Sequence, residues 1–409
     1  MLHSDNSAPI YFKITNETEN HHGFQYVDGL NILQEPFSMG GSCVSGGLYF
    51  TTLEHIHNYY NFGIYLRQVE LPTSDLDFVM VEDSDGDKWR ANKIILGQRY
   101  SLFDPATYQK FGLNIVDNKY IVSKACKIGN VDFLDCWKEL GIDLYYTSWA
   151  INRASANGHV HILQRFLDNG FELKYSNYAI DRASANGHTP VLQFFLDSKL
   201  PLKYSCWAIN NASANGHVNI LNWWKDSGLE LKYSSESMDN ASANGHVDIL
   251  QWWLDSGLEL GYSEAAMDNA SINNRVAVLE WWKNSGLEIG YSSDAIDNAS
   301  ANGHIDVLEW WITSQLDLLY TSRAIDKTSR HNRINILQWW FDSGLELEYS
   351  NAALKLASIN NHIDILYCWR NSGIELKYDI NSIKAMTHKY NNEVIAWWKE
   401  IGIIFNQKN

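Results

Sequence analysis

From about residue 118 to about residue 405 the chain repeats one pattern of small, polar and apolar positions. The string ASANGH ends at His159, His188, His217, His246 and His304, and related strings end at Arg275, Arg333 and His362. The ends of these strings are separated by the interval from His159 to His188 or by a multiple of it. Ten units therefore follow one another in register. A fixed period of roughly 29 residues predicts a repeat array in which each unit packs on its neighbours.

Each unit predicts two helices and a link. Residues 234–246 place small and apolar residues at helical spacing and then reach Asn-Gly, where glycine tolerates the left-handed backbone that ends a helix. The next segment, VDILQWWLDSG, carries Val247, Leu250 and Trp253 in a broad apolar stripe. We therefore expect helix, turn and helix, followed by a link such as LELKYSS that is too short to form a sheet alone.

Adjacent aromatic residues mark the second helix of most units. The second position of the pair is aromatic throughout, which predicts that it belongs to the core, whereas the first accepts Arg165 and two cysteines and is expected to be partly exposed. The first helix is lined with alanine and serine, so neighbouring units can approach closely there. The tryptophan pairs are Trp223/Trp224, Trp252/Trp253, Trp281/Trp282, Trp310/Trp311, Trp339/Trp340 and Trp397/Trp398.

The segment up to about residue 112 has a different pattern. Short β-rich runs such as YFKITN, GGLYFTT and LDFVMVED alternate with Gly, Pro, Asn and Asp, which is typical of a small sheet domain. The string EDSDGDK is acidic but lacks the order of a calcium loop, so an Asp-Gly hairpin turn is the better interpretation. We predict a β-rich α+β capping or recognition domain over residues 1–115 and a mainly α solenoid over residues 116–409.

The repeat unit resembles the ankyrin repeat. In the pattern TPLHLAAxxGHxxIVxLLLxxGAD, the Gly-His falls on Gly245-His246, and DILQWWLDSG occupies the second helix. The chain lacks the Thr-Pro-Leu-His opening, and its period is shorter, with the loss in the connection that forms the ankyrin finger. The resemblance therefore implies an ankyrin-like solenoid with shortened fingers. The compact unit, rich in Asn, Ile and Tyr, is similar to ankyrin proteins of Mimivirus-type giant viruses, as is the string HHGFQYVDGLN before it.

Composition and charge narrow the function classes. With 45% apolar and 20% charged residues the chain is expected to fold. The formal charge of −16 and the absence of a basic run argue against nucleic acid and anionic membranes as partners. The five cysteines are scattered, which favours a reducing compartment. Without an apolar run of signal-peptide or membrane-spanning length, we expect a cytoplasmic protein, in the host cell if it is viral.

The repeated histidines do not predict a metal site. Stacked helices lie about 8–10 Å apart, whereas ligands of one metal lie within about 4 Å of each other. The resemblance implies that these histidines make structural hydrogen bonds. Near the N-terminus, His21, His22, His55 and His57 lack the spacing of a zinc motif, so we predict neither metal nor cofactor.

One enzyme alternative remains open. The run GGLYF, then Tyr59 and LRQVELP, is similar to that of poly(ADP-ribose)-polymerase-type transferases. That resemblance implies that His22 and Tyr49 would cradle nicotinamide, although no catalytic glutamate can be placed. The chain would then be an ADP-ribosyltransferase-like enzyme with the repeats as its targeting arm.

Positions whose residue varies between units are not required for packing, so they are candidates for binding a partner. The most variable column lies at the start of the first helix, and Trp149, Tyr178 and Trp207 are its large aromatic members. These could be interface anchors, or each could pack on the preceding link. Three positions on, Asp239, Asp268 and Asp297 belong to an acidic stripe that could favour a partner with a basic surface, or be a solvated face. We predict a non-enzymatic scaffold that binds a host or viral protein through the first-helix face.

Overall fold

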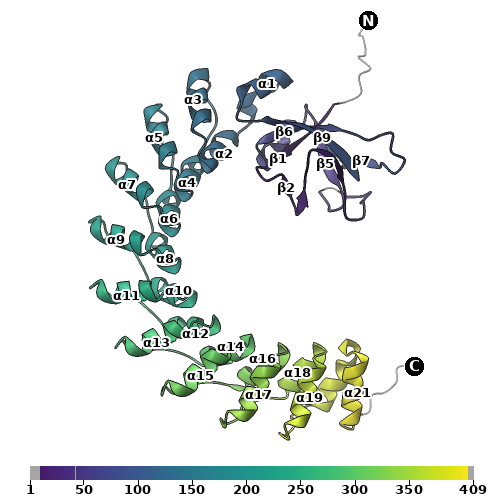
Figure 1. Ribbon diagram of the computed structural model, residues 1–409, viewed down its shortest axis with the longest axis vertical. Coiled ribbons are helices and arrows are strands. Elements are labelled where there is room, and N and C mark those ends of the chain that lie inside the picture. The colour runs from purple at the N-terminus through teal and green to yellow at the C-terminus, as the bar shows by residue number, and fades with distance from the viewer. Residues whose placement is uncertain (1–9, 42, 404–409) are drawn as a thin grey trace. The chain divides into compact units, whose positions relative to one another are not determined.

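The computed structural model describes residues 10–41 and 43–403. Its contacts divide the chain into two units. The first holds the residues up to Arg182 together with Pro190–Lys203, and the second holds Ala183–Thr189 and the residues from Tyr204 onward. The strand-rich segment and the first repeats thus share one unit, and the later repeats form the other (Figure 1). No helix in the described part of the chain is both long and apolar enough to span a membrane.

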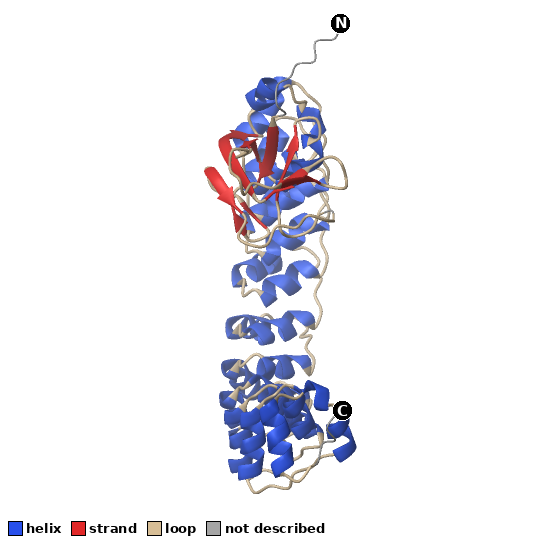
Figure 2. Cartoon of the chain, turned by 90° about the vertical axis from the view of Figure 1, so that its right-hand side faces the viewer, coloured by secondary structure: helices blue, strands red, loops and turns tan. Residues whose placement is uncertain are grey.

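All strands of the described residues, drawn as red arrows in Figure 2, belong to the first unit. Seven of them form one antiparallel sheet in the order β4-β9-β6-β1-β5-β8-β7, and β2 pairs with β3 as a separate hairpin. The strands are β1 (Tyr11–Thr15), β2 (Asn20–His21), β3 (Phe24–Gln25), β4 (Gly29–Ile32), β5 (Leu48–Thr52), β6 (Tyr65–Glu70), β7 (Met80–Glu82), β8 (Trp89–Ala91) and β9 (Lys93–Ser101).

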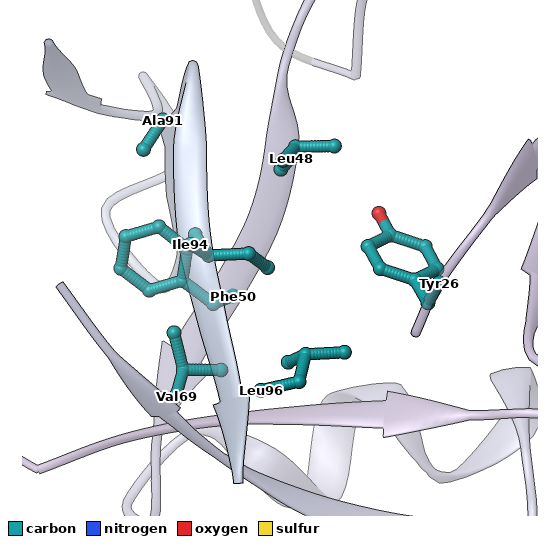
Figure 3. Packing of buried hydrophobic residues seen from close by; sticks show 7 residues of the cluster. All are labelled: Tyr26, Leu48, Phe50, Val69, Ala91, Ile94 and Leu96. Atoms are coloured by element: carbon teal, nitrogen blue, oxygen red, sulfur yellow. The ribbon is translucent and has the colours of Figure 1, made fainter. Parts of the chain in front are cut away.

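One face of the sheet carries a core of buried apolar side chains. In β9, Ile94 and Leu96 are buried while Ile95 between them is only partly so, as expected when alternate side chains of a strand point to opposite faces. Figure 3 shows these two side chains with their neighbours from β5, β6 and β8 and with Tyr26, which follows β3. The members of the cluster are Tyr26, Leu48, Phe50, Val69, Ala91, Ile94 and Leu96.

A fully buried arginine ties two loops to the sheet. Arg67 on β6 pairs with Glu19 at 2.6 Å and with Asp28 at 2.5 Å, and its Nε donates to the carbonyl oxygen of Gly97 at 3.0 Å. Because removing one partner of such a group would leave a charge buried alone, the arrangement constrains the loops on either side of the β2–β3 hairpin.

The acidic string EDSDGDK forms the turn between β7 and β8. The strands pair Glu82 with Trp89, and the backbone N–H of Asp83 donates to the carbonyl oxygen of Lys88 at 2.9 Å. Gly86 has a φ of 75°, the left-handed conformation that a tight turn requires. The predicted Asp-Gly hairpin is confirmed.

Three short helical segments lie between or after the strands, and ten helix pairs follow within the described ranges. The short segments are η1 (Ile56–Phe62), α1 (Pro105–Phe111) and η2 (Ile115–Asp117). The pairs are α2 (Ile121–Ile128) with α3 (Val131–Leu140), α4 (Ser148–Ala156) with α5 (Val160–Asp168), α6 (Asn177–Ala185) with α7 (Thr189–Asp197), α8 (Trp207–Ala214) with α9 (Val218–Asp226), α10 (Glu236–Asn244) with α11 (Val247–Asp255), α12 (Ala265–Ile272) with α13 (Val276–Asn284), α14 (Asp294–Asn302) with α15 (Ile305–Thr313), α16 (Ser322–Arg330) with α17 (Ile334–Asp342), α18 (Ala352–Ile359) with α19 (Ile363–Asn371), and α20 (Ile380–Ala385) with α21 (Asn392–Glu400), the last pair being interrupted by η3 (Thr387–Lys389). The ten predicted helix-turn-helix units are confirmed.

The turn inside each unit is where the Asn-Gly string predicted it. Helix α10 ends at Asn244, and Gly245 follows with a φ of 90°. In the next unit the equivalent position is Asn274, with a φ of 57°, because asparagine is one of the few residues other than glycine that readily adopt this conformation.

In the later repeats, which belong to the second of the two large units, the first helices of neighbouring repeats pack much more closely than the second helices. Helix α10 contacts α12, and α12 contacts α14, far more extensively than α11 contacts α13. Alanines of these first helices, such as Ala241 and Ala270, are completely buried. Small side chains thus permit the close approach that the sequence indicated.

The second aromatic column is core, as predicted. Its Trp253 is 1% exposed, and its Nε1 donates to Oγ of Ser213 in the first helix of the preceding unit at 3.1 Å. The first column is mostly half-buried, and Trp252 donates through Nε1 to Oδ1 of Asn222 at 2.7 Å. The expectation of a partly exposed flank is wrong for three members of that column, Phe194, Trp310 and Trp397, which are buried.

The strand-rich segment is seated on the first repeat. Lys124 of α2 is buried, and its Nζ donates to the carbonyl oxygen of Tyr60 at 2.6 Å and to that of Gly63. The rings of Phe103 and Phe133 make an edge contact with centroids 5.6 Å apart. Burial lowers the pKa of Lys124 to about 8. The apolar end of the first helix pair is thus covered by residues of the sheet segment.

Candidate protein-binding surface

The three aromatic residues singled out at the start of the first helices are exposed. Trp149 in α4 is 55% exposed, Tyr178 in α6 is 46% exposed, and Trp207 in α8 is 50% exposed. Packing on the preceding link, the alternative interpretation, therefore does not bury them. Large aromatic side chains that remain in water are the ones an interface can later bury.

In the large unit that contains the strands, the exposed aromatic residues at the start of the first helices lie next to arginines. The rings of Trp149 and Tyr178 lie 6.0 Å apart. One helical turn further on, the guanidinium carbon of Arg153 lies 5.8 Å from the ring centre of Trp149, and that of Arg182 lies 5.4 Å from the ring centre of Tyr178. Each arginine is thereby held over an aromatic face while its charge stays accessible to solvent.

Sequence reasoning missed one member of this column. Tyr120 stands one repeat before Trp149 and is 48% exposed at the N-terminal end of α2. The same period that located the other three would have found it. It extends the exposed aromatic column by one repeat within the first unit.

The structure corrects the expectation of an accessible acidic stripe. Asp239 and Asp268 are each 7% exposed, and Asp297 is completely buried, so the expectation of an accessible acidic face that would favour a basic partner is wrong. Oδ1 of Asp268 accepts from the backbone N–H of Ser292 at 2.9 Å, and its Oδ2 accepts from the hydroxyl of that serine at 2.5 Å. Asp239 binds Ser263 in the same way, and Asp297 binds Thr321.

These aspartates join one unit to the next. Each carboxylate lies in a first helix and holds a residue just before the next first helix, 24 positions later. Asn210 makes the equivalent pair of bonds to Ser234 with its amide. Burial raises the pKa of Asp297 and that of Asp326, the next member of the column. The column is structural, and either a carboxylate or an amide can fill it.

His304 and His362, two of the repeated histidines, make structural hydrogen bonds, which confirms for them the role that the resemblance implied. Nε2 of His304 lies 2.9 Å from the carbonyl oxygen of Ile272, and Nε2 of His362 lies 3.0 Å from that of Arg330. In each case the acceptor belongs to the end of the preceding first helix. Across the described ranges, no three His, Cys, Asp or Glu side chains are grouped so that they could hold a metal ion.

The two residues of the enzyme alternative lie on different elements. His22 is exposed in the turn of the β2–β3 hairpin, with a φ of 52°. Tyr49 on β5 donates its hydroxyl to the carbonyl oxygen of Val44 at 2.9 Å and accepts from Nη1 of Arg90 at 3.0 Å. The tyrosine hydroxyl is thus committed to bonds within the sheet segment.

A family model identifies the repeat. The family model described as "Ankyrin repeats (many copies)" matches residues 151–196. Among solved structures, the human ASB11 ankyrin repeat domain aligns with a TM-score of 0.35 at 14% identity, covering 45% of this chain and 97% of that one.

Curated relatives come from Acanthamoeba polyphaga mimivirus. "Putative ankyrin repeat protein R868" is 50% identical over 117 residues, which are 27% of this chain and 58% of the relative. "Uncharacterized protein R869" is 46% identical over 129 residues, which are 30% of this chain and 92% of the relative. For the two relatives R868 and L696 the match spans 58% and 30% of their own lengths. The repeat geometry and these identities together place the chain in the family of mimivirus ankyrin repeat proteins.

Proposed function

We propose that the chain is a non-enzymatic scaffold that binds a host or viral protein through the N-terminal ends of its first helices. The observation that carries the proposal is the exposure of Trp149, Tyr178 and Trp207, each close to half accessible, at equivalent positions of three consecutive repeats. Aromatic residues are enriched among the anchors that supply most of the energy of protein interfaces. Elsewhere in the array the same column holds Glu236, Ala265 and Asp294, so stacking does not require an aromatic there.

The rest of the repeat suits a rigid support for such a surface. The second-column tryptophans are buried, and serine, aspartate and histidine side chains make hydrogen bonds between neighbouring units. A surface held on packed helices loses little conformational entropy when a partner binds. Residues 1–115 form a domain that caps the first repeat, and Lys124 of that repeat holds the sheet segment in place.

The cysteines and the viral relatives support a location for this scaffold. None of the five cysteines, all of which lie in the described ranges, forms a disulfide, which fits a reducing compartment. The curated relatives belong to a virus of Acanthamoeba polyphaga. We therefore place the protein in the cytoplasm of the infected host cell.

The test compares captured proteins between matched variants. The full chain and a triple variant with Trp149→Ser, Tyr178→Ser and Trp207→Ser would be used to purify partners from infected cells, with quantitative mass spectrometry. The control changes Tyr145, Leu319 and Tyr367, which are exposed apolar residues outside this column, to serine. Loss of specific partners from the first variant alone supports the proposal. Equal capture by all three proteins would refute it, provided that their thermal unfolding temperatures agree.

A further inference from the structure

The first helices of the first three repeats, α2, α4 and α6, carry four basic side chains and one acidic side chain, in a chain whose formal charge is −16. Three cationic side chains, Lys127, Arg153 and Arg182, are exposed on α2, α4 and α6. None of them forms an ion pair with a carboxylate of the described residues. Arg153 donates to the hydroxyl of Ser123, at 3.2 Å, besides lying over Trp149. These charges are therefore available to a ligand.

The arginine positions are a property of the first repeats. Arg153 and Arg182 occupy equivalent positions of neighbouring repeats, and the equivalents that follow along the sequence are Asn211, Asn240, Asn269 and Asn298, before Lys327. The aromatic column changes over the same stretch, since Glu236, Ala265 and Asp294 follow Trp207. Because stacking of the units proceeds equally well with asparagine there, the packing of the array does not account for the two arginines.

A pocket of about 360 Å³ adjoins this surface. Phe62, Asn61 and Asn157 line it, together with the basic residues Lys124, Lys127 and Arg153. Glu17, the one acidic residue of its lining, lies on the side of the sheet segment. The pocket thus offers N–H donors and positive charge beside an aromatic ring, which suits a carboxylate carried on an apolar chain.

From these features we infer that Tyr120, Trp149, Arg153, Tyr178 and Arg182, named here the aromatic–arginine surface, bind an extended acidic peptide segment of the partner. This inference rests on the proposed function and specifies the chemistry of its partner. Aspartate or glutamate side chains pair with Arg153, Arg182 and Lys127, while the apolar groups between them lie on the aromatic rings. One acidic side chain enters the adjoining pocket. Arginine can form two parallel hydrogen bonds with a carboxylate and keep its aromatic contact at the same time.

The test is a selection from a library of random short peptides displayed on phage, with the full chain as the target. The recovered sequences are expected to be enriched in Asp and Glu next to aromatic or aliphatic residues. A synthetic copy of the most enriched peptide should bind the Arg153→Gln, Arg182→Gln variant at least about tenfold more weakly, since each change removes one ion pair. Its affinity should also fall as salt rises from about 0.05 M to about 0.5 M. The control variant Lys174→Gln, Lys232→Gln removes two exposed charges from the links and should bind normally.

Each other outcome overturns the inference in a distinguishable way. Recovery of basic or neutral peptides that still require Trp149 and Tyr178 would reject the acidic partner and leave the proposed function standing. Peptides that bind the arginine variant and a Trp149→Ser, Tyr178→Ser variant normally, or a selection without enrichment, would reject this surface as a peptide site. Binding of single-stranded poly-U RNA that depends on Arg153 and Arg182, in place of peptide, would assign the surface to nucleic acid.

Discussion

The indole Nε1 of Trp253 donates a hydrogen bond to Oγ of Ser213, at 3.1 Å, across the boundary between two repeats. The same bond, with its partners 40 residues apart, joins Trp282 to Ser242 and Trp340 to Ser300. Each of these tryptophans is therefore both a large buried group and a polar link to the preceding unit. The acceptor is the serine of the string ASANGH, so this repeated motif helps to join neighbouring repeats.

Replacing Trp253 with alanine is expected to destabilise the array far more than replacing Trp252. Trp253 is 1% exposed, and its loss would leave a large cavity, which typically costs about 3–5 kcal/mol for an aromatic residue. Trp252 is only half-buried and gives its N–H to the exposed amide of Asn222, so Trp252→Ala should cost clearly less. Urea denaturation followed by circular dichroism measures both values. Equal losses would contradict the burial difference.

The same substitution at two equivalent serines is expected to act in opposite directions. Ser155 stands to Phe195 as Ser213 stands to Trp253, and because phenylalanine has no N–H to donate, the buried Oγ of Ser155 has no hydrogen-bond partner. Ser155→Ala should therefore be neutral or stabilising, because it removes an unpaired hydroxyl. Ser213→Ala should cost about 1–3 kcal/mol, because it leaves the buried indole N–H of Trp253 unpaired. Thermal unfolding of the two variants checks the sign of each effect, and destabilisation by both would count against this bond as the cause.

Asp268 is expected to tolerate asparagine but not alanine. Asp268→Ala leaves the backbone N–H of Ser292 without its acceptor and should cost about 1–3 kcal/mol. Asp268→Asn can make the pair of bonds that Asn210 makes with Ser234, so its cost should be much smaller. The free energies of unfolding of the two variants, measured at neutral pH, decide the matter. A similar loss in both would mean that the carboxylate charge itself is required.

The stability of the array should carry a pH dependence that comes from the buried aspartates. Burial raises the pKa of Asp297 and of Asp326 in the folded chain, so the folded state holds these protons more tightly than the unfolded state. Stability therefore falls as pH rises from about 4, the ordinary pKa of aspartate, through the raised folded pKa. Over that pH window, the unfolding free energy of the wild type should fall relative to that of the Asp297→Asn, Asp326→Asn variant.

Urea denaturation at a series of pH values measures this difference. The variant Glu259→Gln, Glu288→Gln removes two exposed carboxyls from the links and controls for the change in net charge. If the control shows the same pH dependence as the aspartate variant, the buried carboxyls are not its source.

The sequence by itself determined the repeating architecture of this protein. A strict period without insertions can be satisfied only by units that pack in the same way, so the helix pairs, their Asn-Gly turns and the burial of Trp253 followed from local pattern alone. The aromatic column was visible for the same reason, since a position that accepts tryptophan, glutamate and alanine has no fixed packing partner. Tyr120 belonged to that pattern as well.

Only the tertiary structure decided what the acidic positions do. Helical spacing places Asp268 on the first helix, but its exposure depends on Ser292, which the next unit brings against it from 24 residues away. A polar side chain on a helix is equally compatible with water and with such a partner, because both satisfy its hydrogen bonds. The pocket beside Arg153 had no sequence signature either, since Asn61 and Phe62 come from the sheet segment and meet the repeats only after the chain has folded.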